Sequence, residues 1–265
     1  MPVITRRSCQ EFVEIVEETH KNRHVYLPAN NFGTLSKFRA KAENERMATF
    51  FVTGIDTGIG KTIATGLAAR YLHRQGKKVI TQKLVQTGQH GSISEDILEH
   101  RHLMGTLTSV EDSRGLTCPY SFAYPASPHF AASLEKTVIE PKKLARATEI
   151  LQNHYDYVLL EGAGGFLVPL APDLWIGDYI EQRGYPVILV TSGRLGSINH
   201  TLLTIEAIRR RNLSLACLVF NQHPPEDEAI SNDSLALFRK IFPHVVVLPL
   251  VDSDRIPEID FSCLR

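Results

Sequence analysis

The sequence predicts an α/β fold, in which a doubly wound and mostly parallel sheet carries helices on both faces. Short apolar runs alternate with segments of helical spacing from residue 49 to residue 248. The runs are apolar throughout rather than at every second position, as strands buried on both faces of a parallel sheet are. A glycine-rich turn separates the first run from the first helical segment, which favours a strand–loop–helix unit.

The individual elements follow from apolar spacing and from residues that begin or end helices. Gly76 can follow the first helix because glycine accepts the left-handed conformation common there, and Pro141 suits the first turn of a later helix. Residues 107–128 are rich in turn formers and are expected to be irregular. Strands are expected at 50–52, 78–84, 157–160, 187–190, 213–220 and 245–248. Helices are expected at 63–75, 94–104, 142–154, 176–183, 198–210 and 228–241.

The bulk composition excludes several functional classes. The 265 residues are 43% apolar and 22% charged, which is ordinary for one large globular domain. The 29 basic and 29 acidic side chains cancel, so the charge balance indicates neither a nucleic-acid nor a membrane partner. Four cysteines without C-x-x-C spacing argue against a zinc site or a disulfide framework. Because we find no secretory signal and no apolar run of about 20 residues, we expect a cytoplasmic protein.

The first part of the chain differs from the rest. Residues 20–46 are polar and show no clear period, and they precede the first predicted strand of the sheet. We therefore predict that residues 1–46 form an N-terminal extension of unknown role. The remaining residues, 47–265, are predicted to form the functional domain.

The stretch 49–65 carries the strongest functional signal. After an apolar run, the glycines between Gly54 and Gly60 can let successive backbone N–H groups surround phosphate oxygens. The start of the following helix adds partial positive charge at the same place. Lys61 would then reach the terminal phosphates, and the Thr62 hydroxyl would bind Mg²⁺. This indicates a P-loop nucleotide site, although Ile55 holds the position of the usual first glycine. The alternative is a glycine-rich turn that binds nothing.

Other polar residues follow the predicted strands at the edge of the sheet where ligands of such folds bind. Lys83 ends one strand, Glu161 follows another and Asn221 follows a third, while Asp96 begins a helix. Alone, Lys83 could be a solvated lysine and Asp96 a charge that matches the helix dipole. Glu161 is more specific, because an acid after four apolar residues would lose its solvation without a neutralising cation. Together with Thr62, the two acids would supply hard oxygen ligands for Mg²⁺.

Several strings in this order resemble the dethiobiotin synthetase family over about residues 47–251. They are VTGIDTGIGKT, KLVQTG, SED, PYSFAYPASPH, VLLEGAGGFLVPL, GSINHTLLT and FNQHPP. The resemblance implies a P-loop NTPase-like fold, usually a homodimer. It also implies that the protein joins CO₂ to 7,8-diaminononanoate with ATP and Mg²⁺ to close a cyclic urea, with ATP, CO₂ and the diamine as its small-molecule partners.

The resemblance also assigns residue roles. Lys83 matches the active-site lysine, Thr87 matches a hydroxyl residue that touches the substrate, and Thr62, Asp96 and Glu161 match the metal site. In the family, a partner subunit contacts the substrate carboxylate through a segment that matches Gly196, Ser197, Ile198 and Asn199. Simple helix capping would also explain these residue types at this place. The ATP-binding positions are Gly58, Ile59, Gly60, Lys61, Thr62, Asp96, Glu161, Gly162, Ala163, Gly164, Asn221, Gln222, Pro249 and Leu250.

Two departures and two alternatives qualify this assignment. Leu84 stands where a proline commonly follows the active-site lysine, and Gly58 stands where many members of the family carry a carboxylate. Of the properties that the resemblance implies, the affinity for the substrate is therefore the one that it predicts least firmly. A switch ATPase of the partitioning or septum-positioning type would share the fold, but it usually has an extra lysine early in the loop. A paralogous ATP-dependent ligase would keep the ATP site and act on another substrate.

Overall fold

The structure is a computed structural model that describes residues 48–222, 227–242, 244–249 and 256–265. The predicted extension, residues 1–46, and the predicted adenine neighbour Leu250 lie outside these ranges, and the division of the chain at residue 47 stays a prediction. Within the described residues, no helix combines the length and the apolar character needed to cross a bilayer.

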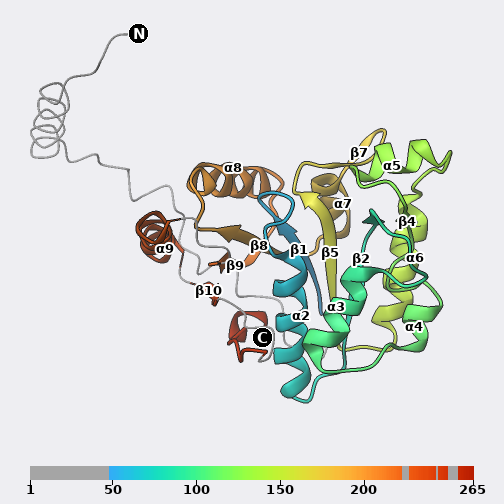
Figure 1. Ribbon diagram of the computed structural model, residues 1–265, viewed down its shortest axis with the longest axis horizontal. Coiled ribbons are helices and arrows are strands. Elements are labelled where there is room, and N and C mark those ends of the chain that lie inside the picture. The colour runs from blue at the N-terminus through green and yellow to red at the C-terminus, as the bar shows by residue number, and fades with distance from the viewer. Residues whose placement is uncertain (1–47, 223–226, 243, 250–255) are drawn as a thin grey trace, which may run out of the picture. The chain divides into compact units, whose positions relative to one another are not determined.

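A six-stranded sheet forms the centre of the fold, and each pair of neighbouring strands in it is parallel (Figure 1). Its strand order is β10-β9-β8-β1-β5-β2, which confirms the predicted doubly wound α/β class. The strands are β1 (Ala48–Gly54), β2 (Val79–Lys83), β5 (Tyr157–Gly165), β8 (Val187–Ser192), β9 (Leu215–Asn221) and β10 (Val245–Leu248).

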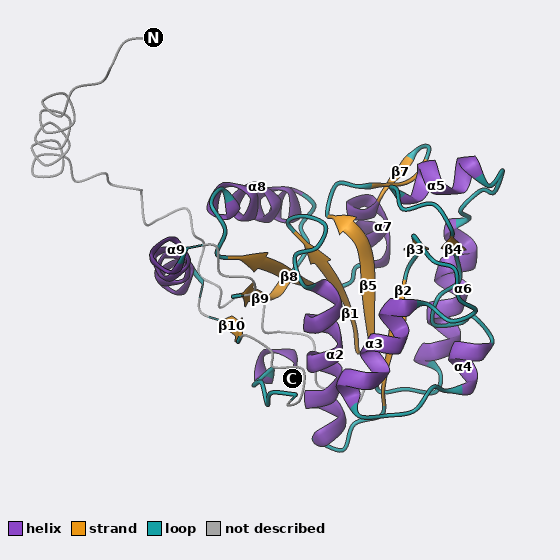
Figure 2. Cartoon of the chain, viewed as in Figure 1, coloured by secondary structure: helices purple, strands orange, loops and turns teal. Residues whose placement is uncertain are grey.

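Helices cover both faces of this sheet (Figure 2). In β1, Phe50 and Val52 pack toward one face and Phe51 toward the other, because successive side chains of a strand alternate. The first face carries α2 (Lys61–Arg74), α3 (Glu95–Met104) and a short 3-10 helix (Ser262–Leu264). The second face carries α6 (Pro141–Gln152), α7 (Ile176–Arg183), α8 (Ser197–Arg210) and α9 (Glu228–Ile241).

The predicted irregular stretch, 107–128, is partly ordered. It contains α4 (Val110–Ser113), where the Ser109 and Asp112 side chains each accept a hydrogen bond from the other residue's backbone N–H. It also contains β4 (Ser121–Phe122), which pairs with β3 (Gln86–Thr87). The prediction of an irregular stretch was wrong at these points. The strand β4 depends on a pairing partner far away in the sequence, whereas α4 depends on the local capping pair Ser109 and Asp112, which the prediction did not use. The other elements without a prediction are α5 (Pro128–Leu134), β6 (Pro169–Ala171) and β7 (Leu174–Trp175), together with β3 and the 3-10 helix.

The strand β5 extends further than its apolar residues predict. Pairing with β1 continues past Glu161 and ends where Gly165 lies beside Gly54. The glycine turn predicted after the strand is therefore part of the strand itself. As a result, Glu161 lies inside the sheet, next to Val52 on one side and Lys83 on the other.

Candidate active site

The loop between β1 and α2 has the backbone of a phosphate-binding loop. Gly58 and Gly60 have φ angles of 67° and 96°, which residues with side chains rarely adopt. Gly60 directly precedes α2, and no side chain caps the first N–H groups of that helix. Free N–H groups at a helix start bind anions, so this turn can hold phosphate oxygens.

Asn221, at the end of β9, packs against the same loop. Its Nδ2 atom donates a hydrogen bond to the Ile59 carbonyl oxygen at 3.1 Å. A Cβ atom on Gly60 would lie only 2.4 Å from that Nδ2 atom, so glycine is needed for this approach. Gln222 follows, and its backbone N–H donates to Leu248 at the end of β10. The predicted adenine neighbours Asn221, Gln222 and Pro249 therefore lie at adjacent strand ends.

Lys61 is buried at the start of α2. Its Nζ atom donates to the Asp56 carbonyl oxygen at 3.0 Å, so the side chain lies back along the loop. Burial, together with the positive charge of Lys83, lowers the pKa of the Lys61 amine to about 8. A bound phosphate would favour the charged form of this amine.

Lys83 joins the two predicted carboxylates. Its Nζ atom lies 2.6 Å from Glu161 Oε1 and forms a second ion pair with Asp96 at the start of α3. The Thr62 hydroxyl donates to the same Glu161 oxygen at 3.2 Å. Residues from β2, α3, β5 and α2 thus converge on one point at the carboxyl edge of the sheet.

The burial of this cluster makes its charges interdependent. The side chains of Lys83 and Glu161 are 7% and 1% exposed. Burial alone would raise the pKa of Glu161, but the Lys83 charge and a hydrogen bond from His100 outweigh it and hold that pKa well below its usual range. Burial likewise opposes the charge on Lys83, but Glu161 and Asp96 raise the pKa of the amine above its ordinary value. Both groups are therefore charged at neutral pH.

His100 belongs to this cluster, and the sequence analysis missed it. It lies one turn beyond Asp96 on α3, is fully buried, and its Nε2 atom lies 2.8 Å from Glu161 Oε2. The signal that could have found it is the i, i+4 spacing from Asp96, which places both side chains on one face of the helix.

The glycines after Glu161 allow close packing against the phosphate loop. A Cβ on Gly162 would lie 2.8 Å from the Phe51 ring, and one on Gly164 would lie 2.9 Å from Val168 and 3.6 Å from the Thr57 hydroxyl. Gly164 also has a φ angle of 70°. Small residues here, including Ala163, keep the end of β5 beside the loop between β1 and α2.

The predicted substrate residues lie in two other places. Thr87 is half-buried in β3, beyond Lys83 along the chain. Gly196 has a φ angle of 90° and precedes α8, whose first N–H groups have no side-chain cap; Ser197 is buried, while Ile198 is half-buried and Asn199 exposed. In the described part of the chain, no hydrogen bond or ion pair joins these residues to the Lys83 cluster.

An ion pair and a hollow connect the phosphate loop with the region of α8. Asp56 pairs with Arg194 in the turn before α8, and that hydrogen bond lowers the pKa of the carboxyl group. Beside it lies a hollow of about 320 Å³, lined by Asp56, Thr57, Leu167 and Leu203 among others. The phosphate loop, the end of β5 and α8 therefore meet around one surface recess.

Comparisons with known proteins find a matching family model and several relatives that share one name. Residues 48–253 match a family described as an AAA domain. The chain is 52% identical over 191 residues to ATP-dependent dethiobiotin synthetase BioD 2 of Pasteurella multocida, covering 72% of this chain and 89% of the relative. A protein named ATP-dependent dethiobiotin synthetase BioD from Chlorobaculum tepidum is 52% identical over 68% of this chain and 75% of its own length. A relative of that name from Lysinibacillus sphaericus is 36% identical over 82% of this chain and 93% of its own.

Among solved structures, a ParA family ATPase from Chlorobium tepidum aligns with 80% of this chain and 86% of its own. The TM-score is 0.47 and the identity 15%, a level of similarity on which no conclusion rests.

Proposed function

This chain belongs to the family of ATP-dependent dethiobiotin synthetases, and from that premise we propose how its residues perform the reaction. It is an ATP-dependent cyclo-ligase that joins CO₂ to 7,8-diaminononanoate and closes the cyclic urea of dethiobiotin. We assign roles to individual residues from one observation: beside the phosphate loop, Lys83 contacts both carboxylates and Glu161 accepts a hydrogen bond from Thr62. The two carboxylates belong to Glu161 and Asp96. Four elements that are distant in the sequence supply these side chains.

The donor set around Lys83 suits Mg²⁺. Within the described residues, no group of three or more His, Cys, Asp or Glu side chains forms a metal site by itself. Two carboxylates and a hydroxyl do lie together, however, and Mg²⁺ commonly takes one or two carboxylates and completes its shell with phosphate oxygens and water. We assign Thr62, Asp96 and Glu161 to this role. When bound with ATP, the ion would offset negative charge on the phosphates.

The remaining steps depend on the substrates and on two lysines. One amine of the diamine adds to CO₂ and gives a carbamate, which is a poor electrophile. A carbamate oxygen then attacks the γ-phosphorus of ATP, and the mixed anhydride forms as ADP leaves. The second amine attacks the carbonyl carbon, closing the urea ring and releasing phosphate. This chemistry needs positioning and charge stabilisation rather than a protein nucleophile.

Lys61 and Lys83 fit the two places where negative charge develops. Lys61 begins the helix at the phosphate loop, so its amine can turn from the Asp56 carbonyl to the β- and γ-phosphates. Lys83 is held between Glu161 and Asp96, and its positive charge can stabilise the carbamate and the anhydride. Thr87 follows Lys83 along the chain and is assigned to the diamine.

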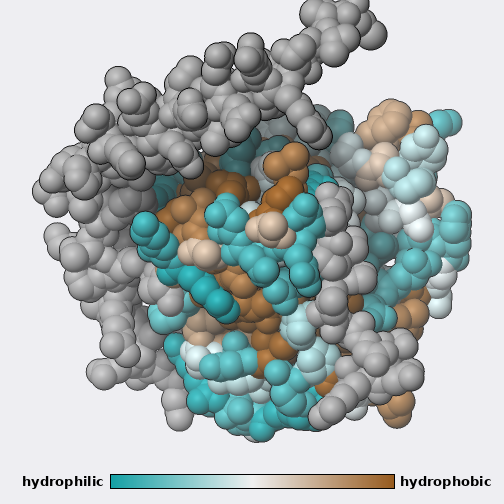
Figure 3. All heavy atoms as spheres, turned by 60° about the vertical axis from the view of Figure 1, so that its left-hand side comes forward, coloured by the Kyte–Doolittle hydropathy of each residue, from teal (hydrophilic) through white to brown (hydrophobic). Residues whose placement is uncertain are grey.

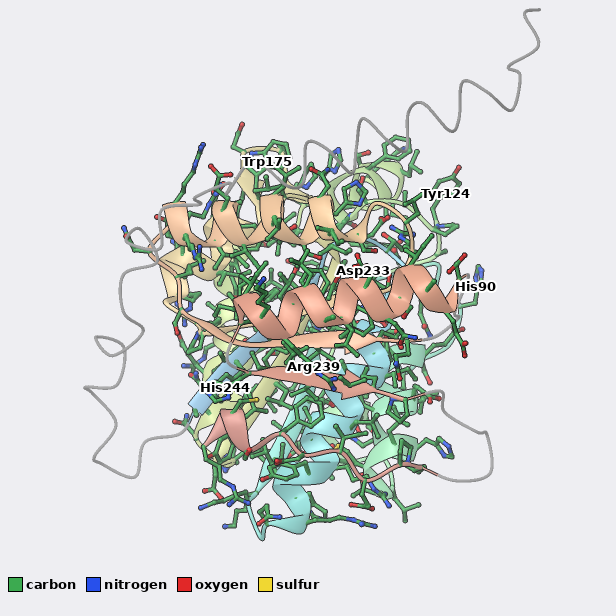
Figure 4. All side chains as sticks on the ribbon, turned by 90° about the vertical axis from the view of Figure 1, so that its left-hand side faces the viewer. His90, Tyr124, Trp175, Asp233, Arg239 and His244 are labelled. Atoms are coloured by element: carbon green, nitrogen blue, oxygen red, sulfur yellow. The ribbon has the colours of Figure 1, made fainter. Side chains whose placement is uncertain are left out.

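A homodimer would complete the substrate site. The start of α8 offers uncapped N–H groups to the carboxylate of the diamine bound by a partner subunit. Exposed apolar side chains lie on α8 (Leu202 and Leu203) and in the turn before it (Leu195). Leu167, which lines one recess together with Leu203, and Trp175 in β7 are exposed as well. Figure 3 shows hydrophobic residues among hydrophilic ones on the side that carries α8 and α9, and in Figure 4 Trp175 lies beyond α8. A second copy of this chain is the proposed partner at this surface. The cytoplasmic location expected from the sequence is also part of the proposal.

Phosphate release separates this function from its alternatives. With ATP, Mg²⁺ and bicarbonate, release should require 7,8-diaminononanoate and should match the amount of cyclic urea found by mass spectrometry. Release that depends on another amine would indicate a paralogous ligase. Release that depends only on a protein or DNA partner would indicate a switch ATPase and would exclude the proposed reaction.

A further inference from the structure

The two oxygens of Glu161 have different surroundings. Oε1 accepts from Lys83 at 2.6 Å and from Thr62 at 3.2 Å, and it therefore faces the phosphate loop. Oε2 lies 2.8 Å from His100 Nε2, on the side of α3. Because a carboxylate can only accept, Nε2 must carry the hydrogen of this bond.

Glu161 is the one hydrogen-bond partner of the His100 side chain within the described residues. This side chain is fully buried, and its Nδ1 atom has no hydrogen-bond partner among the described residues. A buried polar atom without a partner costs free energy and calls for an explanation. The contact with Glu161 is therefore the polar interaction for which this side chain is placed in the core.

We propose that His100 is a positioning residue that fixes the orientation of Glu161 for the metal. By holding Oε2, the imidazole leaves Oε1 as the one Glu161 oxygen directed at Thr62, Lys83 and the phosphate loop. Glu161 would then bind as a ligand through one oxygen, as the small, octahedral shell of Mg²⁺ requires. Such outer partners commonly change metal affinity by about 10- to 100-fold. This inference rests on the proposed metal site.

Two substitutions of similar size separate the hydrogen bond from packing. In His100→Gln, the amide nitrogen has about the reach of Nε2 and can still donate to Glu161. In His100→Asn, the amide is one bond shorter and does not reach. Leu103→Ala provides the stability control, because Leu103 is buried on the same helix and packs against Gly66 on α2, and its apolar side chain cannot hydrogen-bond to Glu161.

The test measures metal binding without turnover. Mn²⁺ is titrated into the full-length protein with a nonhydrolysable ATP analogue, and free Mn²⁺ is followed by electron paramagnetic resonance; nucleotide binding in EDTA is measured beside it. We expect His100→Asn to weaken Mn²⁺ binding about 10- to 100-fold and His100→Gln to stay within about threefold of the parent. Leu103→Ala should lower the melting temperature and leave Mn²⁺ affinity unchanged.

Three results would overturn the inference, and they can be told apart. If the parent binds Mn²⁺ with the analogue and both His100 variants bind it equally well, the positioning role fails while the metal site stands. The role also fails if Leu103→Ala weakens Mn²⁺ binding as much as His100→Asn does. If the parent shows no metal-dependent binding, the metal site itself is refuted, and the role of His100 with it.

Discussion

Replacing Lys83 with methionine tests the electrostatic account most severely. The substitution keeps the apolar stem but removes the cation that lies 2.6 Å from Glu161 and also pairs with Asp96. Glu161 is 1% exposed and would keep a buried, uncompensated charge. Removing one partner of a buried ion pair costs about 3–5 kcal/mol. Asp96 is 23% exposed and can gain water, so it adds less.

This cost should be visible in the melting temperature. For a domain of this size, 1 kcal/mol corresponds to about 2–4 °C, so we expect Lys83→Met to melt roughly 10 °C lower. Mg²⁺ with an ATP analogue should recover part of the loss, because a divalent cation can neutralise both carboxylates. Turnover should fall at least about 100-fold, as expected when a group that stabilises developing charge is removed.

The assay combines calorimetric melting with the rate of cyclic urea formation. Lys78→Met is the matched control, because Lys78 is an exposed lysine just before β2 and should tolerate the change. If Lys83→Met melts with the parent and forms urea within about threefold of its rate, the role of Lys83 is refuted.

Three further predictions concern the phosphate loop. The first is Gly60→Ala, which would force a residue with a side chain to adopt a φ of 96° and would bring its Cβ against Asn221. We expect it to lose about 1–3 kcal/mol of stability in chemical denaturation and to bind an ATP analogue at least tenfold more weakly. Unchanged affinity for the analogue would contradict the geometry. Because the pKa of Lys61 is about 8, below its ordinary value, much of the amine is neutral near pH 8.5, and ATP binding should take up protons there but not near pH 6.5. Calorimetry in buffers of different ionisation enthalpy measures this uptake, and equal uptake at both pH values would refute it. In a double-mutant cycle of Asp56→Ala and Arg194→Ala, the coupling free energy of unfolding should be less than about 1 kcal/mol, because both side chains are partly exposed. A larger coupling energy would show that the pair is effectively buried.

The sequence was sufficient for the parts of the fold that depend on local pattern. The helices 176–183 and 228–241 and the strand 245–248 occur with the predicted bounds. Local residues mark the helix ends, since Gly184 ends α7 and Asp227 caps the start of α9, and the strand is a short apolar run. The convergence of Lys83 and Glu161 could also be anticipated, since parallel strands present their carboxyl ends at one edge.

Other features depend on contacts between distant segments and could not be read from local pattern. The short strand β4 exists through its pairing with β3, and the glycines after Glu161 continue a strand because β1 lies beside them. The i, i+4 spacing places His100 on the same face of α3 as Asp96, but its contact with Glu161 depends on how α3 packs against β5. The roles of Thr87 and Gly196 stay predictions, because each depends on a bound substrate or a second subunit.

The most direct test of the central claim follows an oxygen atom from CO₂ to phosphate. If a carbamate oxygen attacks ATP and ring closure then expels it, reaction with ¹⁸O-labelled CO₂ must give phosphate that carries one ¹⁸O atom, in step with formation of the cyclic urea. Mass spectrometry of the phosphate, at times short enough to limit exchange of CO₂ with water, makes this measurement. Unlabelled phosphate formed alongside the urea would contradict the proposed mechanism.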